Sequence, residues 1–371
     1  MSKKIGILSM QRVINYGSYL QAYGLKKLLL ENGASEVEFI DIVPGQALKG
    51  YEISGFRYKV KRLTRLARVI FECRLFAKKR TASFMKQVED KIKDAWPALG
   101  INSSRQEPTE YDVAVIGSDE VFNCCQSTSW GFTSQLYGDI PQAGTVVSYA
   151  GSFGRTTLEL IEHHGIGNKI AAELNKMMYI SVRDANSRKI VKALTGKEPL
   201  VHIDPVLAYG FRNELETLPC VKESGYILVY SYPDRINDKK EIAAIKSFAK
   251  STGKKLISVM SRYDWCDDAV IPAPLELLAW FKGADYVISE TFHGTIFSII
   301  AQKQFVTFGR STSIAKLTSM LEPYGLAGRL LTVPEDIPDV FGEHIDYNDV
   351  NSRLENLRSE TVDYIKLILN A

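Results

Sequence analysis

The sequence predicts an α/β protein with two domains, each built around a parallel sheet. Short apolar runs alternate with helix-periodic segments along almost the whole chain, which is the pattern of β-α-β units. The 371 residues are too many for one ordinary hydrophobic core. An apolar fraction of 45% with 24% charged residues is typical of a well-packed globular protein and excludes disordered and fibrous classes.

The first series of segments predicts a Rossmann-like domain over residues 1–207. It opens with a strand at 5–10, a glycine-containing loop and a helix at 18–31 that Asn32 and Gly33 close. Further strands are expected at 37–42, 112–116, 145–149, 179–182 and 200–203, with a basic helical segment and a helix at 158–178 between them.

A second Rossmann-like domain is predicted for residues 226–348. Its strands are expected at 226–232, 255–260, 286–289 and 305–308, and its helices at 238–251, 275–283 and 294–302. Residues 208–225 are weakly periodic and contain Gly210, Pro219 and Gly225, so they predict a linker. Residues 349–371 predict a C-terminal helix with one apolar side.

Charge is distributed unevenly along the chain. The net charge is +3, but residues 57–80 hold ten Lys or Arg residues against Glu72 alone, so a uniformly basic nucleic-acid binder is not indicated. Leu63, Leu66, Ala67 and Ile70 recur at helical spacing in this segment. Two interpretations stay open: its apolar side packs on the N-terminal domain, or its cations attract it to an anionic membrane surface.

Compartment and metal content can also be predicted. The apolar run at 5–10 is too short for a signal-peptide core or a membrane span, so we expect a cytoplasmic protein. Five cysteines without C-x-x-C spacing and five histidines without an H-x₃-H pair indicate neither a disulfide framework nor a zinc site.

Two candidate site segments follow strands of the first half. Asn15, Tyr16 and Gly17 precede a helix that carries Gln21, and the free N–H groups there can receive an anion or a sugar hydroxyl. The alternative is an ordinary turn, and the absence of G-x-G-x-x-G argues against a dinucleotide site. Ser118 and Asp119 follow the strand at 112–116, where Asp119 could act as a base or as a helix cap.

Two further strand ends of the first half carry charged residues. Arg183 ends the strand at 179–182, where its guanidinium could bind a carboxylate or phosphate, or could form a surface pair with Asp184. Asp204 precedes Pro205 and is assigned a structural role in a turn.

The most specific segment follows the strand at 286–289. Ser289, Glu290 and His293 lie at the strand end, and Gly294 and Thr295 open an apolar helix. An imidazole beside free N–H groups and a helix dipole could bind phosphate or exchange protons, although a histidine before a helix is more often a turn residue.

A second anion site is expected at the next strand end. Arg310 and Lys316 stand there among Ser and Thr residues, and these groups could bind an anion or form a solvated loop.

Six segments in order resemble the polysaccharide pyruvyl transferase family: NYGSYLQAYGLKK (15–27), IGSDEVFN (116–123), SYAGSFG (148–154), ISVRD (180–184), HIDPVL (202–207) and SETFHGTIFSIIAQK (289–303). The resemblance implies two Rossmann-like domains that face each other across a cleft, as in the GT-B glycosyltransferases. It also implies transfer of a pyruvyl group from phosphoenolpyruvate, as co-substrate and without a further cofactor, onto a saccharide or lipid-linked saccharide in surface-polysaccharide biosynthesis.

The resemblance also implies roles for individual residues. His293 would be the general acid or a phosphate contact, and Asp119 would serve the acceptor. Donor anions would be held by a set made up of Arg183, Ser289, Glu290, Gly294, Thr295, Arg310 and Lys316. The acceptor side would comprise Asn15, Tyr16, Gly17, Gln21 and Ser118.

One departure from the family pattern concerns the donor. Many members read S-D-R-x-H-G where this chain has Glu290 and Thr291, so a cation is lost unless Arg310 or Lys316 replaces it. Two rival functions are a GT-B-type glycosyltransferase that uses a nucleotide sugar and a non-catalytic saccharide-binding relative.

Overall fold

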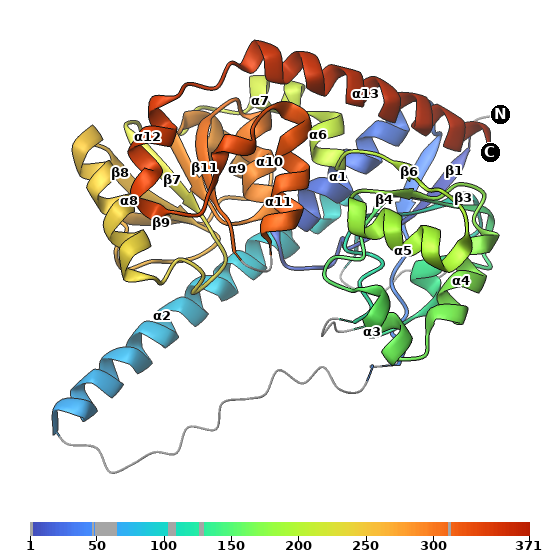
Figure 1. Ribbon diagram of the computed structural model, residues 1–371, viewed down its shortest axis with the longest axis horizontal. Helices are drawn as coiled ribbons and strands as arrows, with labels where there is room; N and C mark the ends of the chain where they lie inside the picture. The colour runs from blue at the N-terminus through green and yellow to red at the C-terminus, as the bar shows by residue number, and fades with distance from the viewer. Residues whose placement is uncertain (1–2, 47, 49–64, 103–108, 126–129, 311–312) are drawn as a thin grey trace.

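The computed structural model describes residues 3–46, 48, 65–102, 109–125, 130–310 and 313–371, and only the backbone of residues 65–79. Two six-stranded sheets, each fully parallel, form the centres of two domains that lie side by side (Figure 1). The predicted fold class is therefore confirmed: the chain forms two Rossmann-like α/β domains that face each other across a shared cavity.

The first sheet has the strand order β2-β1-β3-β4-β5-β6. Its strands are β1 (Lys4–Leu8), β2 (Glu36–Phe39), β3 (Tyr111–Asp119), β4 (Ala143–Gly151), β5 (Ser181–Val182) and β6 (Leu200–Val201). The accompanying helices are α1 (Tyr16–Glu31), α2 (Arg65–Asp94), α3 (Leu158–His163), α4 (Gly167–Lys176), α5 (Ala185–Thr195) and α6 (Pro205–Tyr209).

The apolar run of β3 explains its central place. Val113 and Val115 pack into one core cluster, and the alternate residues Ala114 and Ile116 pack into another. A strand covered on both faces needs a continuous apolar sequence, because successive side chains point to opposite sides of the sheet.

The second sheet has the order β12-β11-β10-β7-β8-β9. Its strands are β7 (Tyr226–Tyr230), β8 (Lys255–Val259), β9 (Asp268–Val270), β10 (Tyr286–Ser289), β11 (Gln304–Phe308) and β12 (Leu330–Leu331). The helices of this half are α7 (Arg212–Thr217), α8 (Lys239–Thr252), α9 (Glu276–Gly283), α10 (Phe292–Ile300), α11 (Ile314–Leu321) and α12 (Ile337–Gly342). Short 3₁₀ helices lie at Trp96–Leu99, Ser134–Tyr137, Glu322–Tyr324, Ala327–Arg329 and Pro334–Asp336.

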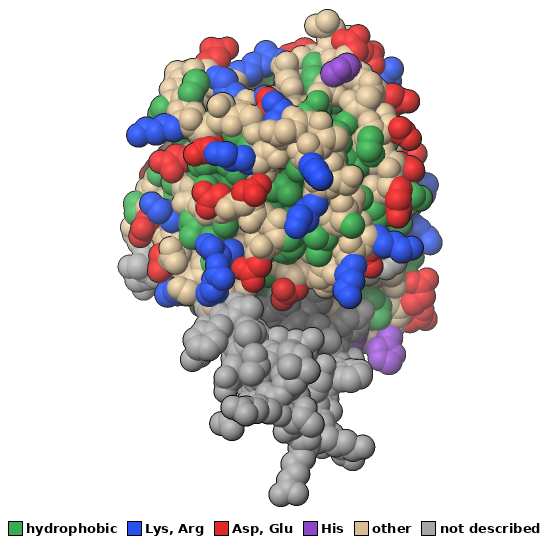
Figure 2. Space-filling model, turned by 90° about the vertical axis from the view of Figure 1, so that its left-hand side faces the viewer, with side chains coloured by type: hydrophobic (Ala, Val, Ile, Leu, Met, Phe, Trp, Pro, Cys, Tyr) green, Lys and Arg blue, Asp and Glu red, His purple; other side chains and the backbone are tan. Residues whose placement is uncertain are grey.

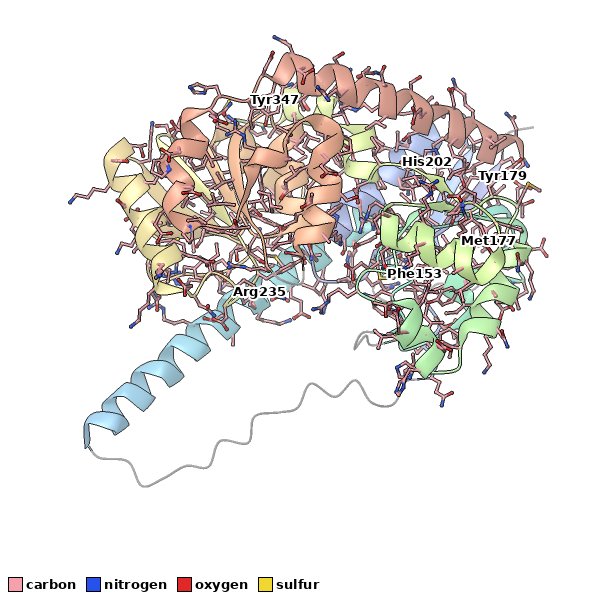
Figure 3. The ribbon with its side chains drawn as sticks, viewed as in Figure 1. Phe153, Met177, Tyr179, His202, Arg235 and Tyr347 are labelled. Atoms are coloured by element: carbon pink, nitrogen blue, oxygen red, sulfur yellow. The ribbon has the colours of Figure 1, made fainter. Side chains whose placement is uncertain are left out.

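Helix α13 (Tyr347–Asn370) crosses both domains (Figure 1). Near its start, the Tyr347 hydroxyl donates to the backbone oxygens of Ser298 and Lys303 in the second domain. Near its end, the Tyr364 hydroxyl donates to the Ser148 oxygen at 2.7 Å, and its ring stacks on His202 in the first domain. Figure 3 shows His202 below this helix. The helix thus ties the two domains together.

The stretch predicted as a linker is partly helical. Residues 208–225 contain the end of α6 and all of α7, and Phe211 is fully buried. Glu214 accepts hydrogen bonds from the hydroxyls of Tyr23 and Tyr209. These contacts fix the segment against α1, because tertiary packing outweighs its weak helical periodicity.

Helix α2 extends away from both domains, and its C-terminal turns alone join the core (Figure 1). Phe84, Val88 and Ile92 are buried there. Most of the predicted basic segment 57–80 lies outside the described residues or among those with an undescribed side chain; exposed Arg80 lies 3.5 Å from Asp264.

The outer face of the second domain carries mixed charges. In Figure 2, Lys and Arg side chains alternate with Asp and Glu side chains over this face, without a large patch of one sign. Within the described part of the chain, no helix combines the length and apolar character needed to cross a membrane.

Candidate active site

One cavity lies where the two sheets face each other. The carboxyl ends of β3 and β10 open toward it, as expected for ligand sites of open α/β sheets. Asp119 follows from the first domain and His293 from the second, and both line this cavity of about 370 Å³. The structure therefore brings together the two predicted catalytic residues.

A buried chain of charges connects the domains beside this cavity. Arg183 Nη1 donates to Asp204 Oδ2 at 2.6 Å, and Arg183 Nη2 lies 3.6 Å from Asp119 Oδ1. His293 Nε2 lies 3.7 Å from Asp204 Oδ2, which is a charge contact too long for a hydrogen bond. The side chains of Arg183 and Asp204 are only 4% and 1% exposed.

The pKa directions favour the charged forms of Arg183 and Asp204. Burial acts to raise the pKa of Asp204, but the adjacent His293 and Arg183 outweigh it and lower that pKa to about 2. Burial acts to lower the pKa of Arg183, but Asp204 and Asp119 outweigh it and raise that pKa. Arg183 is consequently held as a buried cation between two carboxylates.

Some buried N–H donors of the site have no hydrogen-bond partner among the described residues. They are Arg183 Nε, Arg183 Nη2, Arg310 Nε and His293 Nε2, the last counted as a donor when the ring is protonated there. The Nε–Nη2 edge of a guanidinium can bind both oxygens of a carboxylate or phosphate. Unpaired buried donors are costly, so each needs an explanation.

Phe292 lies between two cavities, which are lined by different predicted site residues. Its ring centroid lies 4.4 Å from the Arg183 guanidinium carbon and 4.5 Å from Lys316 Nζ. Phe292 and Lys316 line both the large cavity and a second cavity of about 270 Å³. Arg183 and Asp204 line only the second cavity, so the predicted donor contact does not share the cavity of His293 in this arrangement.

The Asn15-Tyr16-Gly17 segment joins the domains. Asn15 caps α1 by accepting from the Gly17 N–H, and its Nδ2 donates to the Tyr232 hydroxyl at 2.7 Å. The Tyr16 hydroxyl donates to the Pro272 oxygen across the interface. A Cβ atom at Gly17 would lie 2.2 Å from the His293 ring, so only glycine fits. Of the predicted acceptor residues in this segment, Asn15 alone lines the cavity, and Tyr16 and Gly17 are buried.

Asp119 itself is held by the start of α1. Its Oδ2 accepts a hydrogen bond from Ser18 Oγ at 2.9 Å. Its φ of 73° places it in the left-handed region, where non-glycine residues cluster at functional sites. The alternative that Asp119 caps a following helix is not realised.

Four predicted contacts are fully buried and contact the protein interior instead of a ligand. Ser118 Oγ donates to the Ala150 oxygen, Ser289 Oγ to the Tyr230 oxygen, and Gln21 Nε2 to Ser9 Oγ. Thr295 Oγ1 bonds Thr307 Oγ1. The structure corrects these assignments: the four side chains satisfy buried polar groups around the strand ends.

The start of α10 is capped from within the chain. Thr291 Oγ1 accepts from the Gly294 N–H at 2.8 Å, and the Thr291 oxygen accepts from the Thr295 N–H. Gly294 and Thr295 therefore do not offer their N–H groups to an anion, contrary to the prediction. Thr291 acts here as an N-cap residue.

Two predicted cations are already paired. Arg310 forms a two-point contact with Glu241, and Lys316 Nζ lies 3.0 Å from Glu120 Oε1 across the domain interface. Burial acts to raise the pKa of Glu120, but Lys316, Arg183 and Asn123 lower it to about 2. Arg310 or Lys316 could replace the cation that is missing at residue 291 only by breaking its ion pair with Glu241 or Glu120.

Glu290 differs from the other carboxylates of the large cavity. It accepts from the Tyr232 N–H at 3.0 Å and from Ser231 Oγ at 3.4 Å. Burial raises its pKa, although Arg235 and Arg310 act in the opposite direction. Glu290 is therefore a carboxyl group that favours its neutral form more than an exposed glutamate does.

Three residues of the site were missed by the sequence reasoning. Asp204 caps α6 by accepting from the Val206 N–H, as its predicted turn role implies, but it also binds Arg183. The sequence contained a signal for this contact: Asp204 and Arg183 follow neighbouring strands, and neighbouring parallel strands end at the same edge of the sheet. Arg155 and Arg235 line the large cavity and had no signal beyond their positions after strands.

Metal ligation finds no support in the described ranges. Within them, no group of three or more His, Cys, Asp or Glu side chains is placed to hold a metal ion.

Comparison with known families identifies the class of the protein. The sequence model of the polysaccharide pyruvyl transferase family matches residues 15–312, which is most of the chain. The chain belongs to the polysaccharide pyruvyl transferase family. A sequence search of curated proteins found no match.

Solved structures with a similar fold include two UDP-N-acetylglucosamine 2-epimerases. The enzyme from Rickettsia bellii is 11% identical with a TM-score of 0.48, covering 99% of this chain and 96% of that chain. The enzyme from Methanocaldococcus jannaschii is 11% identical with a TM-score of 0.42, covering 95% and 92%. The S. aureus MnaA–UDP structure is 10% identical with a TM-score of 0.48, covering 92% and 87%. At this level of similarity they bear on neither substrate nor reaction.

Proposed function

We propose that this protein transfers a pyruvyl group from phosphoenolpyruvate onto a hydroxyl of a saccharide. The observation that carries the proposal is that Asp119 and His293, from opposite domains, line one cavity between the sheets. Membership of the polysaccharide pyruvyl transferase family supports the same reaction class.

The reaction needs one group that accepts a proton and one that donates it. A saccharide hydroxyl attacks C2 of the enol phosphate while its proton passes to Asp119, and His293 donates a proton to C3. The C2–C3 double bond becomes a single bond, and C2 becomes a tetrahedral centre that still carries the phosphate. A second hydroxyl of the saccharide then attacks C2, the phosphate leaves with the electron pair of its C2–O bond, and the proton of that hydroxyl passes to the neutral His293 left by the first step. The product is a ketal.

The neighbouring charges suit this division of roles. Ser18 holds the Asp119 carboxylate in place, and Asp204 lies at charge-contact distance from His293 Nε2.

The acceptor we propose is a saccharide or lipid-linked saccharide of a surface-polysaccharide pathway, reached from the cytoplasmic side. The basic segment 57–80 would bring the protein to an anionic membrane surface that carries such an acceptor. Helix α2, which contains residues 65–80 of this segment, extends away from the domains (Figure 1).

Calorimetric titration with phosphoenolpyruvate, with and without oligosaccharides, tests the proposal, and mass spectrometry of the saccharide detects the pyruvyl adduct. Asp119→Asn is the matched variant, because asparagine tolerates the left-handed backbone at this position. It should bind phosphoenolpyruvate and fail to transfer it. Binding of a nucleotide sugar in place of phosphoenolpyruvate would establish the glycosyltransferase alternative, and binding of saccharide alone would establish a non-catalytic role.

A further inference from the structure

The charged side chains of the large cavity do not balance. Its cations are Arg155, Arg235, Arg310 and Lys316, and its carboxylates are Asp119, Glu120 and Glu290. Lys316 is paired with Glu120, and Arg310 with Glu241 outside the lining. Asp119 lies beside buried Arg183, which also pairs with Asp204. These pairings leave three charged groups: Glu290 and the two arginines at 155 and 235.

Arg155 and Arg235 are the unpaired cations of this lining. Both are exposed, and the side chain of neither forms a hydrogen bond or ion pair with another described residue. Glu290 accepts hydrogen bonds from the Tyr232 N–H and from Ser231 Oγ, and it forms no ion pair with a described residue. The lining therefore presents two exposed guanidinium groups without an ion-pair partner among the described residues, one from each domain.

The backbone that carries Arg155 is fixed. Gly154 has a φ of 56°, and a Cβ atom there would lie 2.6 Å from Asn123 Nδ2 and Glu120 Oε2. The Gly154 N–H donates to Ser152 Oγ, and Asn186 Nδ2 donates to the oxygens of Gly154 and Thr156. A tight, hydrogen-bonded turn thus presents a side chain that has no partner.

The loop of Arg235, after β7, is fixed as well. The Arg235 N–H donates to the Tyr232 oxygen, and the Arg235 oxygen accepts from Arg310 Nη2 at 2.9 Å. The Tyr263 hydroxyl donates to the Tyr232 oxygen. Figure 3 shows Arg235 at the edge of the second domain. Because the backbone next to each of these guanidinium groups is already ordered, less conformational entropy is lost when the group binds an anion.

We propose that Arg155 and Arg235 bind the two anionic groups of a small dianionic ligand from opposite sides of the cavity. The matching class is a carboxylate-bearing phosphate, because two guanidinium forks fit one carboxylate and one phosphate. This inference rests on the proposed function in naming phosphoenolpyruvate as that ligand. It assigns donor binding to two residues that lie outside the segments carrying the family resemblance. Arg155 directly follows one of these segments, and Arg235 is distant from all of them in the sequence.

The test compares Arg155→Gln and Arg235→Gln with a matched control, Arg262→Gln. Arg262 is exposed, belongs to the second domain, has no ion pair with a described residue and does not line the large cavity. Affinities for phosphoenolpyruvate and for inorganic phosphate are measured by calorimetry at two salt concentrations. We expect each cavity variant to lose affinity for phosphoenolpyruvate by about ten-fold or more, since a hydrogen bond to a charged group is lost. The control should bind as the unmodified protein does.

Kinetics add a second readout. The KM for phosphoenolpyruvate should rise in both cavity variants, while the KM for the saccharide stays unchanged. The dependence of affinity on salt should weaken as each charge is removed.

The outcomes separate this inference from the proposed function. Wild-type affinity for phosphoenolpyruvate in both cavity variants would overturn the inference and leave the proposed function standing. Phosphate binding that needs both arginines, without phosphoenolpyruvate binding, would support the anion site and remove the proposed donor. Failure of the unmodified protein to bind either probe would overturn both.

Discussion

His293 packs so closely on Gly17 that a Cβ atom at residue 17 would lie 2.2 Å from the imidazole ring. The contact joins the first turn of α1 in one domain to the first turn of α10 in the other. The position of the proposed proton donor therefore depends on the way the two domains meet.

Gly17→Ala should displace the His293 ring. An added methyl group in a packed interface costs about 1–3 kcal/mol and shifts neighbouring side chains. We expect a lower midpoint of urea unfolding and a fall in kcat of about ten-fold or more, because small misplacements of a reacting group are costly. Gly328→Ala is the control, since nothing lies within 4 Å of its Cβ position. Equal effects of both substitutions would contradict this account.

His293→Gln should separate binding from chemistry. Glutamine keeps a polar side chain but cannot donate a proton to carbon, so kcat should fall by about 10²-fold or more. Affinity for phosphoenolpyruvate, measured by calorimetry, should change little. If binding and kcat fall equally, His293 anchors the donor; if turnover is retained, His293 takes no part in the reaction.

Asp204→Asn should destabilise the fold strongly. Asparagine can still cap α6, but it leaves Arg183 buried without its closest anion, and breaking such a pair costs about 3–5 kcal/mol. The measurement is the free energy of unfolding in urea at pH 7. Glu223→Gln is the control: it breaks the exposed Lys255–Glu223 pair and should leave the unfolding midpoint nearly unchanged. If the free energy of unfolding falls as little in Asp204→Asn as in the control, the fold does not depend on a carboxylate beside Arg183.

His202 should make stability depend on pH in a defined window. Burial lowers its pKa from 6.5 to about 4, so the folded protein holds the neutral ring. Its contribution is complete above pH 6.5 and is lost as the pH falls toward 4, because the unfolded chain gains the proton first. Unfolding free energies measured between pH 7 and 4 should fall by at most about 1.4 kcal/mol per pH unit from this group.

The matched variants are His202→Asn and His344→Asn. Asparagine at 202 can replace the Nδ1 bond to Ser181, which is 2.7 Å long, and it removes the titration. The pH slope should flatten in that variant and persist when exposed His344 is replaced. An unchanged slope in His202→Asn would assign the pH dependence to other groups.

The basic segment 57–80 should bind anionic vesicles. Each well-placed cation contributes about 1 kcal/mol near such a surface, so co-sedimentation should occur with anionic vesicles, not with neutral ones, and should be lost at high salt. Reversal of Arg62, Arg65 and Arg68 to Glu should abolish it. Indifference of the unmodified protein to both vesicle types would leave the segment as an ordinary charged helix.

The sequence was sufficient for the long elements of the fold. Apolar runs such as Tyr286–Ser289 agree in full with the observed strand, and the predicted terminal helix differs from α13 by a few residues at its ends. The short edge strands β9 and β12 were missed, because two or three residues carry no periodicity. The helical character of 208–225 was missed because it depends on packing against α1.

The candidate site was only partly predictable. Position after a strand located Asp119, Arg183 and His293, since parallel strands end at one edge. It could not show that Arg310 pairs with Glu241, 69 residues away, or that Thr295 faces Thr307. Pairing and burial depend on how side chains from distant segments meet, and so the free cations at 155 and 235 became apparent only in the structure.

The path of α13 makes the second domain an insertion within the first. The chain leaves the first domain after α6 and returns to it along α13, so two separate passages connect the domains. Two connections restrict rotation of one domain relative to the other. We therefore expect the cleft to open by bending about an axis that passes near both connections. Both chain ends lie at the first domain (Figure 1), so a pulling force applied between them would load that domain and leave the cleft unstretched. Reporter groups that are to follow cleft opening therefore belong on opposite walls of the cavity instead of at the chain ends.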